Sequence, residues 1–227
     1  MKVDFTSSGE FQPALVHVQP GQTVVSDSGA MYRSSPNIDF DVSVRSRGGG
    51  ILSGLKRAMG GDSFFLSTYK TQDQHAGEVG LAPVLPGDIR HVDVDGSTWV
   101  CAGGSFLACD GSLDMDTRFQ GLKGFFSGES LFFVEVAGQG GLLVNAYGRI
   151  SEVEVTDELV VDTGHVVAFE SSLSYELTKM GSSWVQSFLA GEGFVLRFRG
   201  SGRLLVQSHN PKEFGSRLGK HLPPRKA

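Results

Sequence analysis

The chain has 227 residues, of which 40% are hydrophobic and 20% charged, and its formal net charge is −5. This composition is typical of a globular protein and excludes a disordered or fibrous one. No apolar run in the sequence approaches the roughly 18 residues that cross a bilayer, and its first ten residues resemble neither a signal peptide nor a transit peptide, so we expect a cytoplasmic protein.

Thirty-one glycines predict many tight turns, and many turns predict many short strands. The segment IDFDVSV at 38–44 alternates apolar and polar residues, which predicts a strand with one buried face. Helical spacing is limited to ILSGLKRAM at 51–59, where we expect one or two turns because Gly54 weakens a helix by about 1 kcal/mol. HVDVDG at 91–96 lacks the ligands of a calcium loop and predicts a polar-faced strand that runs into a turn.

The second half of the chain continues this β pattern. DGSLDMD at 110–116 predicts a solvated strand edge rather than a carboxylate site. SLFFVEV at 130–136 has large apolar residues on both faces, so we expect a strand covered by a second sheet and by a neighbouring copy or subunit. GFVLRFR at 193–199 places apolar side chains on one face and two arginines on the other, which predicts a face exposed to water.

The last residues differ in charge from the rest of the chain. Residues 212–227 contain five basic side chains and one acidic side chain, a net +4, which leaves −9 for residues 1–211. Because nucleic acids and anionic lipids are bound mainly through cationic contacts, this acidic body predicts no nucleic-acid partner and gives no support to a peripheral membrane contact. Phe214, Leu218 and Leu222 are spaced four apart, but two glycines and a Pro-Pro pair predict a mobile or late-ordering tail.

Three stretches of the chain resemble one another. When Gly29, Gly104 and Gly164 are aligned, apolar residues recur at equal offsets through the first half of each stretch. In the second half of every copy, a carboxylate that follows a glycine precedes an apolar segment, and the first copy is lengthened by an insertion at 71–86. The copies span roughly residues 24–94, 98–155 and 159–210.

These copies set the expected architecture. The spacing between them is uneven, which argues against an open solenoid of uniform repeats and favours a closed body. We therefore predict an all-β fold of three tandem β repeats in a pseudo-threefold arrangement. It forms a single domain over residues 1–211, and a basic C-terminal tail follows at 212–227.

In two of the three copies a lysine precedes the aligned carboxylate by six residues, and in the third copy a glutamine replaces the lysine. One interpretation is a loop-closing ion pair, Lys56 with Asp62 and Lys123 with Glu129, which is favoured because such pairs are common at loops. The other places Asp62, Glu129 and Glu192 around the pseudo-threefold axis. There the three carboxylates would share a cation or raise one another's pKa.

No catalytic motif is recognisable in the sequence. RGGGILSGLKRAMGG lacks the spacing of a phosphate-binding loop, the histidines show no HxH or HExxH arrangement, and no GxSxG nucleophile elbow occurs. His165 is interpreted as a scaffold residue because Ala30 and Ser105 occupy the equivalent positions. Cys101 and Cys109 have no metal-site spacing and fit a reducing compartment. We therefore predict no enzymatic activity, no metal and no cofactor.

Several segments together resemble one known family: GAMYRSSPNIDF, GLKRAMGGDSFFLSTY, GEVGLAPVLPGDI, QGLKGFFSGESLFF, VDTGHVVAFESSLSYE and GEGFVLRFRGSGRLLVQSHNP. From about Val24 to Pro211, they are similar in order and spacing to the altered-inheritance-of-mitochondria protein 24 family, whose prokaryotic members have unknown function. The resemblance implies three β repeats, each similar to the subunit of the tryptophan RNA-binding attenuation protein, within the double-stranded β-helix class. It also implies that mitochondrial members take part in inner-membrane organisation without catalysis, and it supplies no catalytic or ligand residues.

The sequence is compatible with four functions. The leading hypothesis is a non-enzymatic scaffold or assembly protein that acts through its surfaces, with a protein partner or as a homo-oligomer. The alternative is a small-molecule or lipid-binding module with a cavity inside a repeat or along the axis. RNA binding by analogy of fold is opposed by the acidic body, and a metal-dependent enzyme has no motif to support it.

Overall fold

The computed structural model describes residues 1–5, 11–43, 65–120, 131–179 and 194–223. These residues form β-strands, one 3₁₀ turn (η1, Thr163–His165) and one α-helix (α3, Pro211–Gly219), which confirms the predicted all-β class. The strands are β1 (Lys2–Phe5), β2 (Ala14–Val18), β3 (Thr23–Asp27), β4 (Met31–Ser34), β5 (Ile38–Ser43), β6 (Leu66–Thr71), β7 (Gly77–Leu81), β8 (Ile89–Ala102), β9 (Phe106–Asp110), β10 (Asp114–Gln120), β11 (Leu131–Asn145), β12 (Ile150–Val155), β13 (Glu158–Asp162), β14 (Val166–Glu170), β15 (Ser174–Lys179), β16 (Phe194–Arg199) and β17 (Gly202–Gln207).

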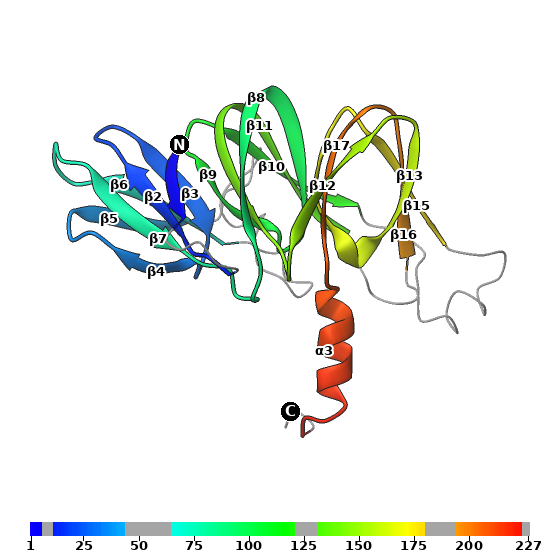
Figure 1. The fold of residues 1–227 in the computed structure, drawn as a ribbon. Helices are drawn as coiled ribbons and strands as arrows, with labels where there is room; N and C mark the ends of the chain where they lie inside the picture. The colour runs from blue at the N-terminus through cyan, green and yellow to red at the C-terminus, as the bar shows by residue number, and fades with distance from the viewer. Residues whose placement is uncertain (6–10, 44–64, 121–130, 180–193, 224–227) are drawn as a thin grey trace.

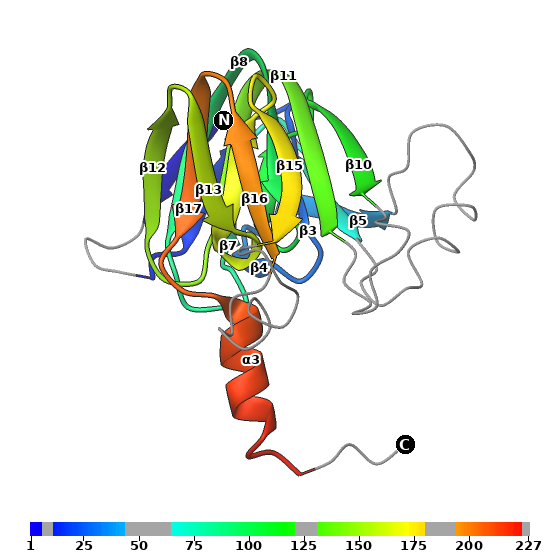
Figure 2. The same cartoon turned by 90° about the vertical axis from the view of Figure 1, so that its right-hand side faces the viewer.

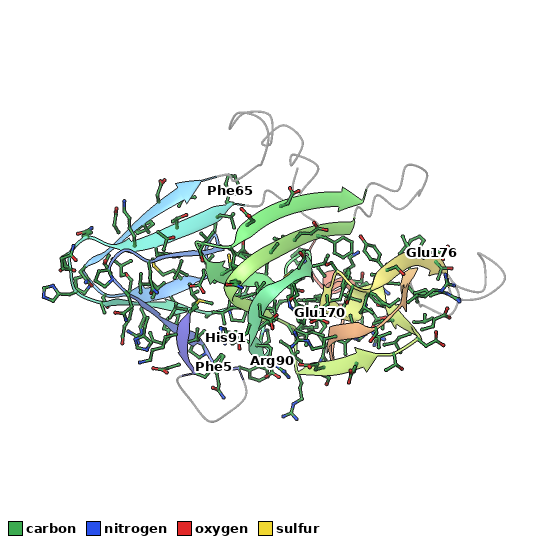
Figure 3. The ribbon with its side chains drawn as sticks, turned by 90° about the horizontal axis from the view of Figure 1, so that it is seen from above. Phe5, Phe65, Arg90, His91, Glu170 and Glu176 are labelled. Carbon is green, nitrogen blue, oxygen red and sulfur yellow. The ribbon has the colours of Figure 1, made fainter. Side chains whose placement is uncertain are left out.

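The described strands form three sheets, and every pair between named strands is antiparallel. The largest sheet has the order β12-β17-β14-β8-β11-β9-β3-β6-β5, with β10 paired to β11. The second has the order β1-β2-β7-β4, and the third has the order β13-β16-β15. Figure 1 shows the strands advancing in a row from blue through green to orange, and Figure 3 shows the same row from above.

One pairing order occurs three times along the chain. β6 lies between β3 and β5, the first half of β11 lies between β8 and β10, and β16 lies between β13 and β15. A second order also recurs, with β7 between β2 and β4, the second half of β11 between β8 and β9, and β17 between β12 and β14. The pairs β3·β9 and β8·β14 connect each of these groups of strands to the next one along the row. The pseudo-threefold arrangement and the copy boundaries stay predictions.

The two longest strands take part in both pairing orders because each bends at a glycine. Gly96 in β8 has φ +91° and Gly138 in β11 has φ +122°, a backbone conformation that residues with a side chain rarely adopt. The register of the β8·β11 pair shifts between Ala137 and Gln139, at the bend of β11. Such an irregularity turns a strand and increases its twist. Each long strand therefore contributes one half to each of two packed layers.

The core consists of three apolar clusters along the row of strands. Val134 and Val136 of β11 lie in the central cluster, whereas Phe133 lies in the cluster at the β13–β16 end. The Phe133 ring meets the Phe169 ring edge-on, with 6.0 Å between centroids. The prediction that this strand is covered on both faces is therefore confirmed for its described side chains. The cover comes from the same chain, so these residues offer no surface for a second subunit.

Strand β5 departs from the predicted one-sided burial. Ile38 is buried, but Phe40 and Val42 are 55% and 51% exposed although they alternate as a buried face would. β5 is the last strand of the largest sheet, so it has a hydrogen-bonded neighbour on one side among the described strands. The Phe40 ring contacts Tyr69 of the neighbouring strand, with 6.5 Å between centroids. Sequence periodicity alone therefore does not set the exposure of these side chains.

Two further segments differ from expectation, and a third lies outside the described residues. β7 lies inside the predicted insertion at 71–86, yet it pairs with both β2 and β4 and belongs to the recurring order. The tail that was predicted to be mobile or late-ordering forms α3 over 211–219, where Asn210 caps the helix and Pro211 occupies its first turn. The helical turns expected at 51–59 lie outside the described residues.

Candidate functional site

The residues singled out by the repeated lysine-to-carboxylate spacing are not covered by the structure. Asp62, Glu129, Glu192, Lys56 and Lys123 all lie outside the described residues. The two interpretations, ion pairs at loops and carboxylates around an axis, therefore stay predictions. Among the residues that are described, no group of three or more His, Cys, Asp or Glu side chains is arranged to hold a metal ion.

Other residues considered from the sequence have structural contacts. His165 Nδ1 lies 2.8 Å from the backbone oxygen of Gln207, a contact between η1 and β17 that fits a scaffold role. Asp114 and Asp116 are exposed, as expected for a solvated strand edge. Asp110 differs, because its Oδ2 accepts a hydrogen bond from the Gly141 backbone N–H at 2.6 Å. These contacts hold strands together and leave no described cluster for chemistry.

A pocket of about 370 Å³ lies beside the first residue of α3. Five segments distant in sequence build it: the turn after β3, the loop after β7, the turn between β8 and β9, the end of β11, and the last residue of β17 with the first residue of α3. Most of its wall is apolar and consists of Ala30, Ala82, Pro83, Val84, Leu85, Leu107 and Ala146. Apolar walls with a few polar groups and a volume of at least about 300 Å³ are typical of small-molecule sites.

The two turns that line the pocket are built alike. Each is closed by a backbone hydrogen bond from its fourth residue to the carbonyl of its first, 3.3 Å long in the turn that Asp27 begins and 3.0 Å long in the turn that Ala102 begins. Each has a left-handed glycine at its third position, Gly29 with φ +90° and Gly104 with φ +84°. Because Cβ would strain this conformation, glycine fixes the turn. The recurring fold therefore brings two equivalent turns to one pocket.

Asp27 is the carboxylate in the pocket wall. Burial raises the pKa of Asp27 from 3.8 to about 6, and a hydrogen bond from the Ser28 backbone N–H opposes this rise only in part. Ionised Asp27 thus stands in apolar surroundings that favour its neutral form. A carboxyl group in a cleft whose pKa is raised by desolvation is a candidate functional residue on physical grounds.

Asp162 shows how the fold satisfies a carboxylate at the corresponding place. Asp162 ends β13 as Asp27 ends β3, and both precede an aligned glycine by two residues. The Oδ1 atom of Asp162 accepts hydrogen bonds from Gly164 N–H at 2.8 Å and from Asn210 Nδ2 at 3.2 Å. Asp27 has no such side-chain donor among the residues described.

Helix α3 begins at the rim of this pocket and projects away from the strands (Figures 1 and 2). Asn210 Oδ1 accepts hydrogen bonds from the backbone N–H groups of Lys212 at 3.0 Å and Glu213 at 3.3 Å. These bonds satisfy donors that a helix N-terminus otherwise leaves unpaired. The first turn is therefore fixed although the helix contains two glycines.

One face of α3 is apolar and open to solvent. Phe214 and Leu218 lie four residues apart on α3 and are 47% and 46% exposed, and Leu222, three residues beyond the helix, is 58% exposed. Side chains four apart lie on the same face of a helix. The Tyr147 ring lines the pocket and also lies 5.5 Å from the Phe214 ring. The apolar face of α3 is thus continuous with the pocket at its base.

Sequence reasoning found part of this site. It identified the spacing of Phe214, Leu218 and Leu222, of which the first two lie on α3, and the Asn-Pro step before them is a helix-start signal that was present. It did not identify the pocket, because five separate segments form it and none carries a local motif. The position of Asp27 two residues before an aligned glycine was visible, but its burial was not.

The chain was compared with known proteins. The family model Mitochondrial biogenesis AIM24 matches residues 4–209. An uncharacterized protein of Streptococcus pyogenes serotype M6 is 28% identical over 230 residues, which cover 98% of this chain and 92% of that protein. A crystal structure of a protein from Streptococcus pyogenes superposes with a TM-score of 0.82 at 27% identity, covering 97% of this chain and 99% of that one. In the described part of this chain, no helix has the length and apolarity that a membrane crossing requires.

Proposed function

The chain belongs to the Mitochondrial biogenesis AIM24 family, and from the geometry of α3 we propose that it is a non-enzymatic scaffold protein that acts through its surfaces. The observation that carries this proposal is the solvent-exposed apolar face of Phe214 and Leu218 on a helix that projects from the body, with exposed Leu222 just beyond the helix (Figure 2). Apolar side chains gathered on one face of a projecting element mark an interaction site.

A second copy of the chain is the partner that the charges favour. Residues 212–227 carry a net +4, and the remaining residues carry −9. Basic side chains Arg217 and Lys220 accompany the apolar face on α3. Opposite charges on tail and body attract one copy to the next and repel body from body. Each copy then donates its helix to one neighbour and receives a helix from another, a head-to-tail contact that can close into a ring.

The size of the helix face argues for assembly into a ring rather than a single contact. Each of the three apolar side chains is about half exposed, so complete burial contributes about 1 kcal/mol apiece. A total near 3 kcal/mol is less than the roughly 4–15 kcal/mol that association costs. In a closed ring the last contact is intramolecular, so ring closure adds one contact without a further association cost.

Light scattering across a range of concentrations tests the proposal. The variant Phe214→Ser with Leu218→Ser removes apolar area from the helix face, and we expect it to be monomeric at concentrations where the natural chain is oligomeric. The matched control is Gln72→Ser with Gln74→Ser, which changes two exposed residues outside α3 and keeps the net charge. Equal oligomer size in both variants would show that the apolar face is not the contact.

The pocket favours a second candidate function, a small-molecule-binding module. Its volume of about 370 Å³ and its mostly apolar wall support this candidate. Native mass spectrometry of the protein purified from its own cells is the corresponding test. A bound compound of defined mass that disappears when the pocket is filled, for example in Ala146→Leu, is the expected result. An identical adduct on that variant would place the compound elsewhere.

A further inference from the structure

The pocket beside α3 combines an apolar wall with one carboxylate. Leu85, Leu107 and Ala146 contribute hydrocarbon surface, whereas Asp27 contributes an anionic group at the end of β3. Asp27 and Tyr147 are the titratable side chains among the described residues of the lining. No cationic side chain is among those lining residues, so the wall presents a single charge to whatever occupies the pocket.

Other carboxylates that are partly buried in this fold have partners. Glu170, labelled in Figure 3, binds Arg203 through both of its oxygens, with Nε at 2.8 Å from Oε1 and the backbone N–H at 2.8 Å from Oε2. Asp162 accepts hydrogen bonds from Gly164 and Asn210. Asp27 has the backbone N–H of Ser28, and no described side chain supplies a second donor. A half-buried carboxylate without a charged partner is unfavourable for the fold.

From this geometry we propose that the pocket binds a small primary ammonium ion that carries a short apolar chain, with Asp27 as its anionic partner. The proposal rests on the second candidate function and names its ligand class. The ammonium group donates one hydrogen bond to the Asp27 carboxylate, and the hydroxyls of Ser28 and Ser105 in the lining offer acceptors for the others. The hydrocarbon chain lies against Leu85, Leu107 and Ala146.

The composition of the lining distinguishes an ammonium ion from other ligands. A carboxylate or phosphate ligand would meet the charge of Asp27 with no described cation to offset it. A metal ion needs several hard ligands, and the described residues gather no such group here. A neutral alcohol would fill the apolar part but would leave Asp27 without an opposite charge. A charge-assisted hydrogen bond in a partly buried site is the strongest contact that the pocket can make.

Isothermal titration of the full chain with hexylamine, hexan-1-ol and hexanoate tests the proposal at neutral pH. We expect hexylammonium to bind, hexanoate not to bind, and Asp27→Asn to weaken hexylammonium binding by roughly tenfold to a hundredfold. The matched control Asp41→Asn removes an exposed carboxylate outside the pocket lining and should leave the affinity unchanged. Urea unfolding of each variant verifies that it is folded.

The dependence on pH is a second readout. The affinity for hexylammonium should be constant between about pH 7 and 9, where the amine is protonated, and should fall below about pH 6, where the Asp27 carboxyl binds a proton. Equal affinity of the natural chain and Asp27→Asn would overturn the role of Asp27. If hexan-1-ol binds and hexylamine does not, the ammonium assignment fails although the pocket remains a ligand site. If none of the three compounds binds, both the ligand class and the second candidate function are wrong.

Discussion

Replacing Asp27 with asparagine should stabilise the protein at neutral pH. In the folded chain burial raises the pKa of Asp27 from 3.8 to about 6, so ionising this carboxyl above that pH opposes folding. The shift is just over two units, and each unit corresponds to about 1.4 kcal/mol. The upper bound is therefore about 3 kcal/mol, and partial access to water lowers the expected gain to about 1–3 kcal/mol.

The sign of the pH dependence follows from the direction of the shift. Because the pKa is higher in the folded chain, the contribution of Asp27 to stability is fully present below pH 3.8 and is lost as the pH rises through about 6. Asparagine cannot ionise and still offers an oxygen to the Ser28 N–H. The free energy of unfolding of Asp27→Asn should therefore exceed that of the natural chain at pH 8, and the difference should shrink towards zero at pH 4.

Urea unfolding at pH 4, 6 and 8 measures this difference, with Asp41→Asn as the control for a general change in charge. Asp41 is exposed and lies outside the pocket lining, so its replacement should have little effect at any of the three pH values. Lower stability of Asp27→Asn at pH 8 would refute the reasoning. An equal difference at all three pH values would also refute it, because the effect would then not come from ionisation.

Four other substitutions test separate parts of the fold. Asn210→Ala removes the cap of α3 and should weaken that helix by about 1 kcal/mol, seen as faster amide exchange in α3 with the strands unchanged. Gly96→Ala places a side chain at φ +91° with no atom within 4 Å, so a decrease of about 1–2 kcal/mol in the free energy of unfolding would measure backbone strain alone. Gly215→Ala replaces a glycine within α3 and should raise the helicity measured by circular dichroism. Arg203→Met leaves Glu170 without its guanidinium partner and should lower the free energy of unfolding by about 1–3 kcal/mol in urea.

The strands could be predicted from the sequence where burial follows local alternation. The apolar segments that follow the aligned carboxylates lie in β6, β11 and β16, and each of these strands lies between two neighbours in the same pairing order. The continuity of β8 and β11 could not be predicted, since Gly96 and Gly138 look like turns between separate strands. In the structure they bend strands that continue to pair.

The same contrast between local sequence patterns and long-range packing explains which parts of the candidate site could be predicted from the sequence. The capping signal at Asn210 and Pro211 was present but was not used, and the prediction rested on two glycines and the Pro-Pro pair. Gly215 and Gly219 face open space, where each reduces helix stability by about 1 kcal/mol without preventing the helix. Burial of Asp27 depends instead on segments more than fifty residues away, such as the loop after β7 and the end of β11. Such proximity is a property of the folded chain and has no local pattern.

Zero-length cross-linking of mixed isotope-labelled and unlabelled chains tests the proposed assembly most directly. A carbodiimide joins a lysine to a carboxylate only where the two are in contact, and the mixed isotopes identify links between different copies. The account predicts mixed-isotope links from Lys212 or Lys220 of α3 to carboxylates of the body, and their loss in Phe214→Ser with Leu218→Ser. Links confined to single chains, or mixed links that persist in that variant, would contradict it.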